Sequence, residues 1–188
     1  MSKVYFSIGS NKGNRSELIN EAITKIDISI GKVELKSSIY ETKSWGFKSS
    51  NFYNICLLVD SSLSVELILN KTLKIEKDMG RLNSRDQYID RCIDIDILFV
   101  EDIIVNSKDL IIPHPRLHLR KFVLTPMLDL APDLIHPILN KSIRQLELEC
   151  EDNDQPKKLI SYNSVLKKKS QSTIPAATET FKECFVPT

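Results

Sequence analysis

The segment 91–100, which reads RCIDIDILFV, constrains the fold of this chain most strongly. It is rich in β-branched and aromatic residues and contains neither Gly nor Pro, so it predicts a strand buried in a sheet. Because alternate residues of a strand share a face, Asp94 and Asp96 should point the same way, roughly 7 Å apart. Two buried like charges are costly unless a cation neutralises them. The segment therefore indicates either a divalent-metal site, most naturally Mg²⁺ carrying substrate phosphates, or a solvent-facing strand whose carboxylates meet water.

The composition excludes several classes of protein. The 188 residues, 41% of them hydrophobic, suffice for one domain with a core, and 26 basic against 25 acidic residues leave a net charge of +1. This near-neutral balance argues against a nucleic-acid partner. The four cysteines, with no C-x-x-C spacing, indicate reduced thiols in a cytoplasmic protein. The chain has no signal-peptide h-region and no run long enough for a membrane span, so we expect no membrane partner. We also expect a monomer.

The pattern of apolar residues predicts the elements in order. We expect strands over 4–8, 33–42, 52–60 and the acidic segment, a hairpin from 103–105 and 110–112, and helices over 14–31, 64–79, 126–130 and 142–148. The order strand–helix–strand, strand–helix–strand predicts a ferredoxin-like α+β sandwich, βαββαβ. Its sheet should be antiparallel or mixed, with helices on one face, plus the small hairpin and the C-terminal helices. We expect one domain over 1–150 and a polar, partly disordered C-terminal extension over 151–188.

Polar residues at element ends are candidates for binding. The Gly-containing loop 9–14 could hold a phosphate or be an ordinary β-to-α turn. In the strand 52–60, Phe52 and Asn54 share a face, which suits stacking and edge recognition of a flat heterocycle, although an amide near a strand start is often only a turn residue. The residues on the opposite face of that strand, Tyr53, Ile55, Leu57 and Val59, should belong to the core.

Basic residues flank the acidic strand on both sides in the sequence. The loop before it contains Arg81, Arg85 and Tyr88 and leads into Arg91, which would suit a triphosphate beside a metal or simply be a solvated charged loop. After it, Pro113 and Pro115 restrict the backbone around His114. A rigidly held histidine near arginines and a metal strand is a phosphate-site candidate, whereas a lone histidine is usually structural.

These motifs together resemble the 6-hydroxymethyl-7,8-dihydropterin pyrophosphokinase (HPPK) family of folate biosynthesis, over about residues 3–148. The resemblance rests on short motifs in the expected order: IGSN at 8–11, YET at 40–42 with Trp45-Gly46, FYN at 52–54, Ile75-Glu76, Gly80-Arg81, R-x-x-DIDI at 91–97, PHPR at 113–116 and R-x-FVL at 120–124.

The resemblance implies that the β,γ-pyrophosphoryl group of ATP moves to the pterin hydroxymethyl oxygen, with release of AMP. It implies that Asp94 and Asp96 bind two Mg²⁺ ions and act in catalysis with Arg81 and Arg91. The implied pterin site consists of Thr42, Lys43, Trp45, Phe52, Asn54 and Phe122. The implied ATP site consists of Glu76, Arg81, Tyr88, Arg91, Ile97, His114 and Arg120.

The chain departs from the family pattern in the approach to the acidic strand. Asn83 stands where a second arginine is frequent, Arg85 is shifted from that position, and Ile89-Asp90 replaces a small residue and proline. No segment resembles a dihydroneopterin aldolase or a dihydropteroate synthase, so we expect one activity. Two alternatives stay open: another two-metal transferase on a ferredoxin-like fold, which needs a nucleic-acid track, and a non-catalytic ligand-binding module, which leaves the aspartates and arginines unexplained.

Overall fold

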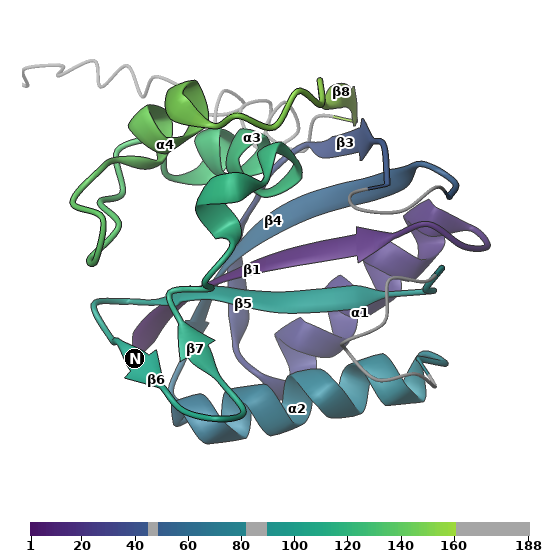
Figure 1. Ribbon diagram of the computed structural model, residues 1–188. Helices are drawn as coiled ribbons and strands as arrows, with labels where there is room; N and C mark the ends of the chain where they lie inside the picture. Colours follow the sequence, from purple (N-terminus) through teal and green to yellow (C-terminus); the bar gives the residue numbers. More distant parts are fainter. Residues whose placement is uncertain (45–48, 82–89, 161–188) are drawn as a thin grey trace, which may run out of the picture.

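The computed structural model describes residues 1–44, 49–81 and 90–160 (Figure 1). Its elements follow the chain in this order: β1 (Ser2–Ser10), α1 (Arg15–Ser29), β2 (Lys32–Lys36), β3 (Ile39–Thr42), β4 (Phe52–Ser61), α2 (Val65–Asp78), β5 (Asp94–Val100), β6 (Val105–Asn106), β7 (Ile111–Ile112), the 3₁₀ turn η1 (Leu117–Leu119), α3 (Lys121–Leu130), α4 (Ile143–Glu149) and β8 (Lys157–Ile160).

One sheet organises the molecule. Its strand order is β5-β1-β4-β3-β8, with β2 also pairing β4, and every pairing described within this sheet is antiparallel. The elements from β1 to β5 therefore form the predicted ferredoxin-like βαββαβ unit, and that prediction is confirmed. The predicted hairpin is also confirmed, as β6 pairs antiparallel with β7. Among the described residues, no helix is long and apolar enough to cross a membrane.

Helices cover both faces of the sheet (Figure 1). Helices α1 and α2 pack on one face, where Ile23 and Ile68 join Phe6 and Ile55 in the larger apolar cluster. Helices α3 and α4 pack on the other face, in a second cluster that includes Cys56, Leu98, Met127 and Leu146. The sequence predicted the first pair on one face and left the C-terminal helices unplaced.

The helix ends follow from local chemistry. The side chains of Asn14 and Ser64 cap α1 and α2 by accepting the backbone N–H three residues on. Helix α2 is followed by Gly80 at φ +90°, a left-handed conformation that costs glycine little. Because both helices start directly after a residue type that favours the N-cap position, their starts could be predicted from the sequence.

Two predicted elements were wrong in their bounds. The strand predicted over 33–42 is split into β2 and β3 by Ser37 and Ser38. The Ser37 hydroxyl accepts from the N–H of Cys56 and donates to the carbonyl of Ser38, while the N–H of Ser38 donates to Asp129 at 2.9 Å. These bonds satisfy backbone groups that a continuous strand would pair in its ladder. Helix α3 begins at Lys121, five residues before the predicted start at Pro126, which lies inside the helix.

The expected domain boundary near residue 150 falls short of the folded part of the chain. Strand β8 extends the sheet beyond β3, so residues 157–160 belong to the sheet rather than to a disordered extension. Residues 151–156 connect α4 to β8 without regular secondary structure, as a linker would. The remainder of the expected extension, 161–188, lies outside the described residues.

Candidate active site

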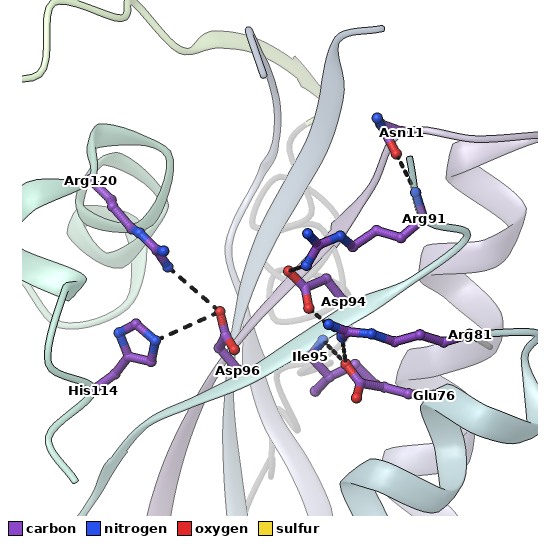
Figure 2. Close-up of polar contacts among 9 residues, drawn as sticks. All are labelled: Asn11, Glu76, Arg81, Arg91, Asp94, Ile95, Asp96, His114 and Arg120. Carbon is purple, nitrogen blue, oxygen red and sulfur yellow. Dashed lines mark hydrogen bonds and ion pairs between the residues drawn. The ribbon is translucent and has the colours of Figure 1, made fainter. Parts of the chain in front are cut away.

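Strand β5 presents two carboxylates on one face. The side chains of Asp94 and Asp96 are 24% and 23% exposed, whereas Ile95 and Ile97 between and beside them are buried in the larger core cluster. This alternation is what the period of a strand requires, so the predicted common direction of the two aspartates is confirmed. The carboxylates lie at the sheet edge near the start of β5, where two groups of basic side chains meet them (Figure 2).

Two arginines hold Asp94. Nη1 of Arg91 lies 2.8 Å from Oδ2 of Asp94, and Nη1 of Arg81 pairs with Oδ1 of the same carboxylate. Arg81 also pairs with the buried Glu76. Burial opposes the charge on Arg81, but Asp94 and Glu76 outweigh it and hold its pKa above the ordinary value. The guanidinium groups therefore supply the positive charge that a pair of partly buried carboxylates requires.

Asp96 faces a second group on the opposite side (Figure 2). Its Oδ2 lies 3.8 Å from Nη1 of Arg120 and 3.9 Å from Nε2 of His114. Burial lowers the pKa of His114, and Arg120 and Arg116 lower it further against the opposing effect of Asp96. The lowered pKa favours the neutral form of His114. Its Nδ1 accepts the N–H of Arg116 at 3.2 Å, which places the ring proton on Nε2, toward Asp96.

A pocket opens on one side of the carboxylates. Its walls include Phe52 from β4 and Phe122 from α3, and Thr42, Lys43 and Asn54 also line it. Nδ2 of Asn54 donates to the Thr42 hydroxyl at 2.7 Å, which fixes the orientation of the amide.

Gly9 makes room for this pocket. A Cβ atom at Gly9 would lie 2.9 Å from Oδ1 of Asn54 and 3.5 Å from a ring carbon of Phe52. The first distance is shorter than real Cβ contacts, so only glycine allows Asn54 to keep its place. Gly9 belongs to β1 rather than to a loop, and it serves the pocket wall.

A second pocket opens on the other side. Basic groups dominate its walls, which include Arg81, His114 and Arg116, and also Lys108 from the β6–β7 turn. The two pockets share four lining residues, Arg91, Asp94, Asp96 and Arg120. The carboxylates thus lie where an aromatic-walled pocket and a cationic pocket meet.

The structure brings together most of the residues predicted from the sequence. Thr42, Lys43, Phe52, Asn54 and Phe122 line the first pocket; Arg81, Ile97 and His114 line the second; Arg91, Asp94, Asp96 and Arg120 line both. Glu76 lines neither, because it is 2% exposed and lies behind Arg81. Trp45 and Tyr88, and likewise Asn83 and Arg85, lie outside the described residues. Lys108, Asp109 and Leu110 were missed, since a short turn gave no signal of its nearness to β5.

Asn11 is a further residue that was missed. Its Oδ1 accepts the N–H of Arg91 at 2.8 Å, and its own N–H donates to the carbonyl of Arg91 at 3.3 Å (Figure 2). Its Nδ2 donates to Asp90 at 2.8 Å and to the Ser49 hydroxyl at 3.1 Å. Asn11 therefore joins the end of β1 to the segment that leads into β5 and to Ser49 in the loop before β4. Asp90, a departure from the family pattern, has a partner in this contact.

The sequence profile of the 7,8-dihydro-6-hydroxymethylpterin-pyrophosphokinase (HPPK) family matches residues 5–132. The chain belongs to this family. A 2-amino-4-hydroxy-6-hydroxymethyldihydropteridine pyrophosphokinase of Aquifex aeolicus is 39% identical over 150 residues, which cover 79% of this chain and 92% of that protein. The folic acid synthesis protein fol1 of Pneumocystis carinii is 45% identical over 152 residues, which cover 80% of this chain and 20% of the fungal protein. The chain thus spans most of the Aquifex aeolicus protein and one fifth of the Pneumocystis carinii protein.

Solved structures with HPPK in their names share the fold. A crystal structure of an HPPK-DHPS in complex with substrates matches with a TM-score of 0.64 at 14% identity, over 93% of this chain and 45% of that chain. The wild-type HPPK-DHPS of Plasmodium falciparum matches with a TM-score of 0.63 at 18% identity, over 79% of this chain and 44% of that chain. At these identities the match supports the fold alone.

The two aspartates fit the metal that the HPPK resemblance implies. Mg²⁺ prefers oxygen ligands and is usually bound through one or two carboxylates, substrate phosphates and water. Asp94 and Asp96 offer such oxygens at the meeting point of the two pockets. Across the described part of the chain, no cluster of three or more His, Cys, Asp or Glu could hold a metal ion by itself. A magnesium site here would therefore depend on phosphate oxygens and water for its remaining ligands.

Proposed function

We propose that this chain transfers the diphosphoryl group of ATP to 6-hydroxymethyl-7,8-dihydropterin and releases AMP. The observation that carries this proposal is the pair of pockets that share Arg91, Asp94, Asp96 and Arg120. One pocket has the aromatic walls that suit a flat heterocycle, and the other has the positive charge that suits a triphosphate. The pyrophosphokinase names of the relatives support the same reaction.

The first pocket is the proposed acceptor site. The rings of Phe52 and Phe122 would stack on the two faces of the pterin, and Asn54 with Thr42 would hydrogen-bond its edge. The backbone around Thr42 and Lys43 would complete the edge contacts. Trp45 joins this site on the resemblance alone, because it lies outside the described residues. Stacking together with these edge hydrogen bonds would fix the orientation of the pterin, so that its hydroxymethyl group could be directed toward the carboxylates.

The second pocket is the proposed ATP site. Arg81, Arg91 and Arg120 would contact phosphate oxygens, with neutral His114 as a hydrogen-bond donor and Ile97 as an apolar contact. Glu76 would not contact ATP itself but would hold Arg81 in position through their ion pair. Tyr88 is included on the resemblance alone. When phosphates bind, Arg81 and Arg91 can release Asp94 and pair with phosphate oxygens instead. Each arginine then still has an anionic partner, so the exchange leaves no guanidinium charge uncompensated.

We infer that Asp94 and Asp96 hold two Mg²⁺ ions together with ATP. Magnesium held by these carboxylates would compensate the negative charge of the phosphate groups during transfer. The hydroxymethyl oxygen forms a bond to the β-phosphorus, the bond from that phosphorus to the α,β-bridging oxygen breaks, AMP leaves with that oxygen, and the hydroxyl proton is lost. Phosphoryl transfer of this kind depends on alignment and on charge compensation, which the aromatic walls and the arginines provide.

Both proposed sites are lined by residues of one chain, so the reaction needs no second copy and agrees with a monomer. Cys56, Cys92 and Cys150 are free thiols, which agrees with the proposed cytoplasmic location.

The deciding experiment is an assay with ATP, Mg²⁺ and 6-hydroxymethyl-7,8-dihydropterin, with the nucleotide products separated by chromatography. We expect AMP in a one-to-one ratio with the pterin diphosphate. Release of ADP would indicate an ordinary kinase, release of inorganic diphosphate would indicate a nucleotidyltransferase, and no turnover would indicate a binding module. Each of these three outcomes would overturn the proposal.

A further inference from the structure

The segment that follows α4 contacts both walls of the first pocket from outside. Oδ2 of Asp152 accepts the backbone N–H of Lys121 at 3.0 Å, and Oδ2 of Asp154 accepts the backbone N–H of Lys43 at 3.2 Å. The N–H of Asp154 also donates to Oδ1 of Asp152 at 3.0 Å. Two linked carboxylates therefore join the start of α3 to the end of β3, although these positions are 78 residues apart in the chain.

The two backbone groups that these carboxylates hold are next to pocket residues. Lys121 lies between Arg120 and Phe122, both of which line the first pocket. Lys43 lines that pocket itself and follows Thr42, the partner of Asn54. A shift of either backbone segment would change the distance between the Phe122 wall and the Thr42 edge.

Asp152 provides a hydrogen-bond acceptor at the start of α3 that the N-cap residue of the helix does not provide. The N-cap residue of α3, Arg120, makes no capping hydrogen bond through its side chain. The first N–H groups of a helix need acceptors, and a negative charge there is favourable because of the helix dipole. Asp152 supplies both from a segment 31 residues away, so the position of α3 depends on the segment that carries this residue.

Strand β8 fixes the other end of the segment. It pairs with β3 through the register Tyr40–Lys158 and Glu41–Lys157. Nζ of Lys158 lies 3.3 Å from Oδ1 of Asp129 on α3, and Asp129 also accepts the hydroxyl of Tyr40 at 3.2 Å. Residues 151–160, which we name the C-terminal brace, are therefore attached to α3 and β3 at two points each.

We propose that the C-terminal brace is a positioning element of the acceptor site, with Asp152 and Asp154 as positioning residues that set the width of the first pocket. This inference rests on the proposed function, because it assigns the pterin as the ligand whose fit depends on that width. Neither aspartate lines the pocket, so each acts through the backbone of Lys121 or Lys43. The second pocket has no wall from the brace, and of the residues next to the held backbone groups only Arg120 lines it. ATP binding should therefore depend on the brace much less than pterin binding does.

The test compares Asp152→Ala, Asp154→Ala and the double variant with wild type in steady-state assays on the full chain. In the double variant we expect the KM for the pterin to rise about tenfold and the KM for ATP to change less than twofold. We expect Asp154→Asn to restore the wild-type pterin KM, because its amide oxygen can still accept the N–H of Lys43. Asn153→Ala is the matched control, since this exposed residue lies between the two aspartates.

The outcomes separate the inference from the function on which it rests. No wild-type turnover of the pterin would refute the proposed function and the inference together. Wild-type turnover with an unchanged pterin KM in the alanine variants, or with equal rises in both KM values, would refute the inference alone. If the double variant does not fold, the single variants decide, each with an expected rise of about threefold in the pterin KM.

Discussion

The carboxylate of Glu76 on α2 accepts a 2.7 Å hydrogen bond from the backbone N–H of Ile95, the residue between the two aspartates of β5 (Figure 2). The same carboxylate pairs with Arg81, which in turn pairs with Asp94. One buried group thus fixes the acidic strand against α2 and also holds an arginine of the site. The resemblance implied an ATP contact for Glu76, but the structure gives it a supporting position behind the cationic pocket.

Replacement of Glu76 should separate these two tasks. We expect Glu76→Ala to lower the free energy of unfolding by about 3–5 kcal/mol, because it leaves Arg81 and the N–H of Ile95 buried with one partner fewer. Glu76→Gln should lose clearly less, since its amide oxygen can still accept the N–H of Ile95. Urea denaturation measures both. Asp78→Asn, an exposed change at the end of the same helix, is the control, and equal losses in the two Glu76 variants would contradict this account.

Asp96 should be necessary for turnover and dispensable for folding. We expect Asp96→Asn to reduce the rate of AMP release by about 10²–10³-fold, a loss typical of a removed charge-stabilising group. The side chain is 23% exposed and nearly isosteric with asparagine, so the melting temperature should stay close to that of wild type. Asp102→Asn, in the exposed turn after β5, should keep full activity. A rate near wild type in Asp96→Asn would remove Asp96 from the metal site.

Replacement of Phe122 should affect binding of the pterin acceptor more than binding of the nucleotide. We expect Phe122→Ala to weaken pterin binding by about 1–3 kcal/mol, the usual loss when one aromatic stacking partner is removed. Affinity for a non-hydrolysable ATP analogue should change little, because Phe122 lines the first pocket and not the second. Titration calorimetry measures both ligands. The control is Leu119→Ala, which removes an exposed apolar side chain close by in sequence. Equal losses for the two ligands would argue against the aromatic walls.

The sequence correctly predicted the features that depend on neighbouring residues of one strand. The alternation of Asp94 and Asp96 with Ile95 and Ile97 follows from the strand period alone, and it holds because both isoleucines belong to the larger core cluster while both aspartates line the pockets. The pattern of β4 was read correctly for the same reason: Ile55 and Leu57 are core, while Phe52 and Asn54 face the first pocket. The resemblance added roles for these residues that no period could assign.

The errors have their causes far away in the sequence. The strand predicted over 33–42 breaks because Ser38 donates to Asp129, 91 residues later. Helix α3 starts at Lys121 because Asp152, 31 residues later, accepts its first N–H, so a proline at 126 could not mark the start. Lys108 reaches the cationic pocket only because β7 lies near β5 in the fold. The sequence around each of these positions gives no indication of its distant partner.

Asp129 should make stability depend on acid pH. Burial opposes its ionisation, but hydrogen bonds from Ser38 and the charge of Lys158 outweigh burial and hold the pKa of Asp129 below its ordinary value of 3.8. The folded protein therefore binds this proton less readily than the unfolded chain does. The stabilisation from ionised Asp129 is fully present above the ordinary value and is lost as pH falls below it through the folded-state pKa.

Asp129→Asn tests this linkage directly. We expect the variant to be about 1–2 kcal/mol less stable than wild type at pH 7, because it weakens the bonds to Ser38 and Lys158. The difference between the two proteins should shrink as pH falls below about 4, where wild type also loses the carboxylate. Urea denaturation between pH 3 and pH 7 measures the difference, with Asp133→Asn, whose side chain is 85% exposed, as the control. A difference that stays constant down to pH 3 would show that ionised Asp129 does not stabilise the junction of α3, β3 and β8.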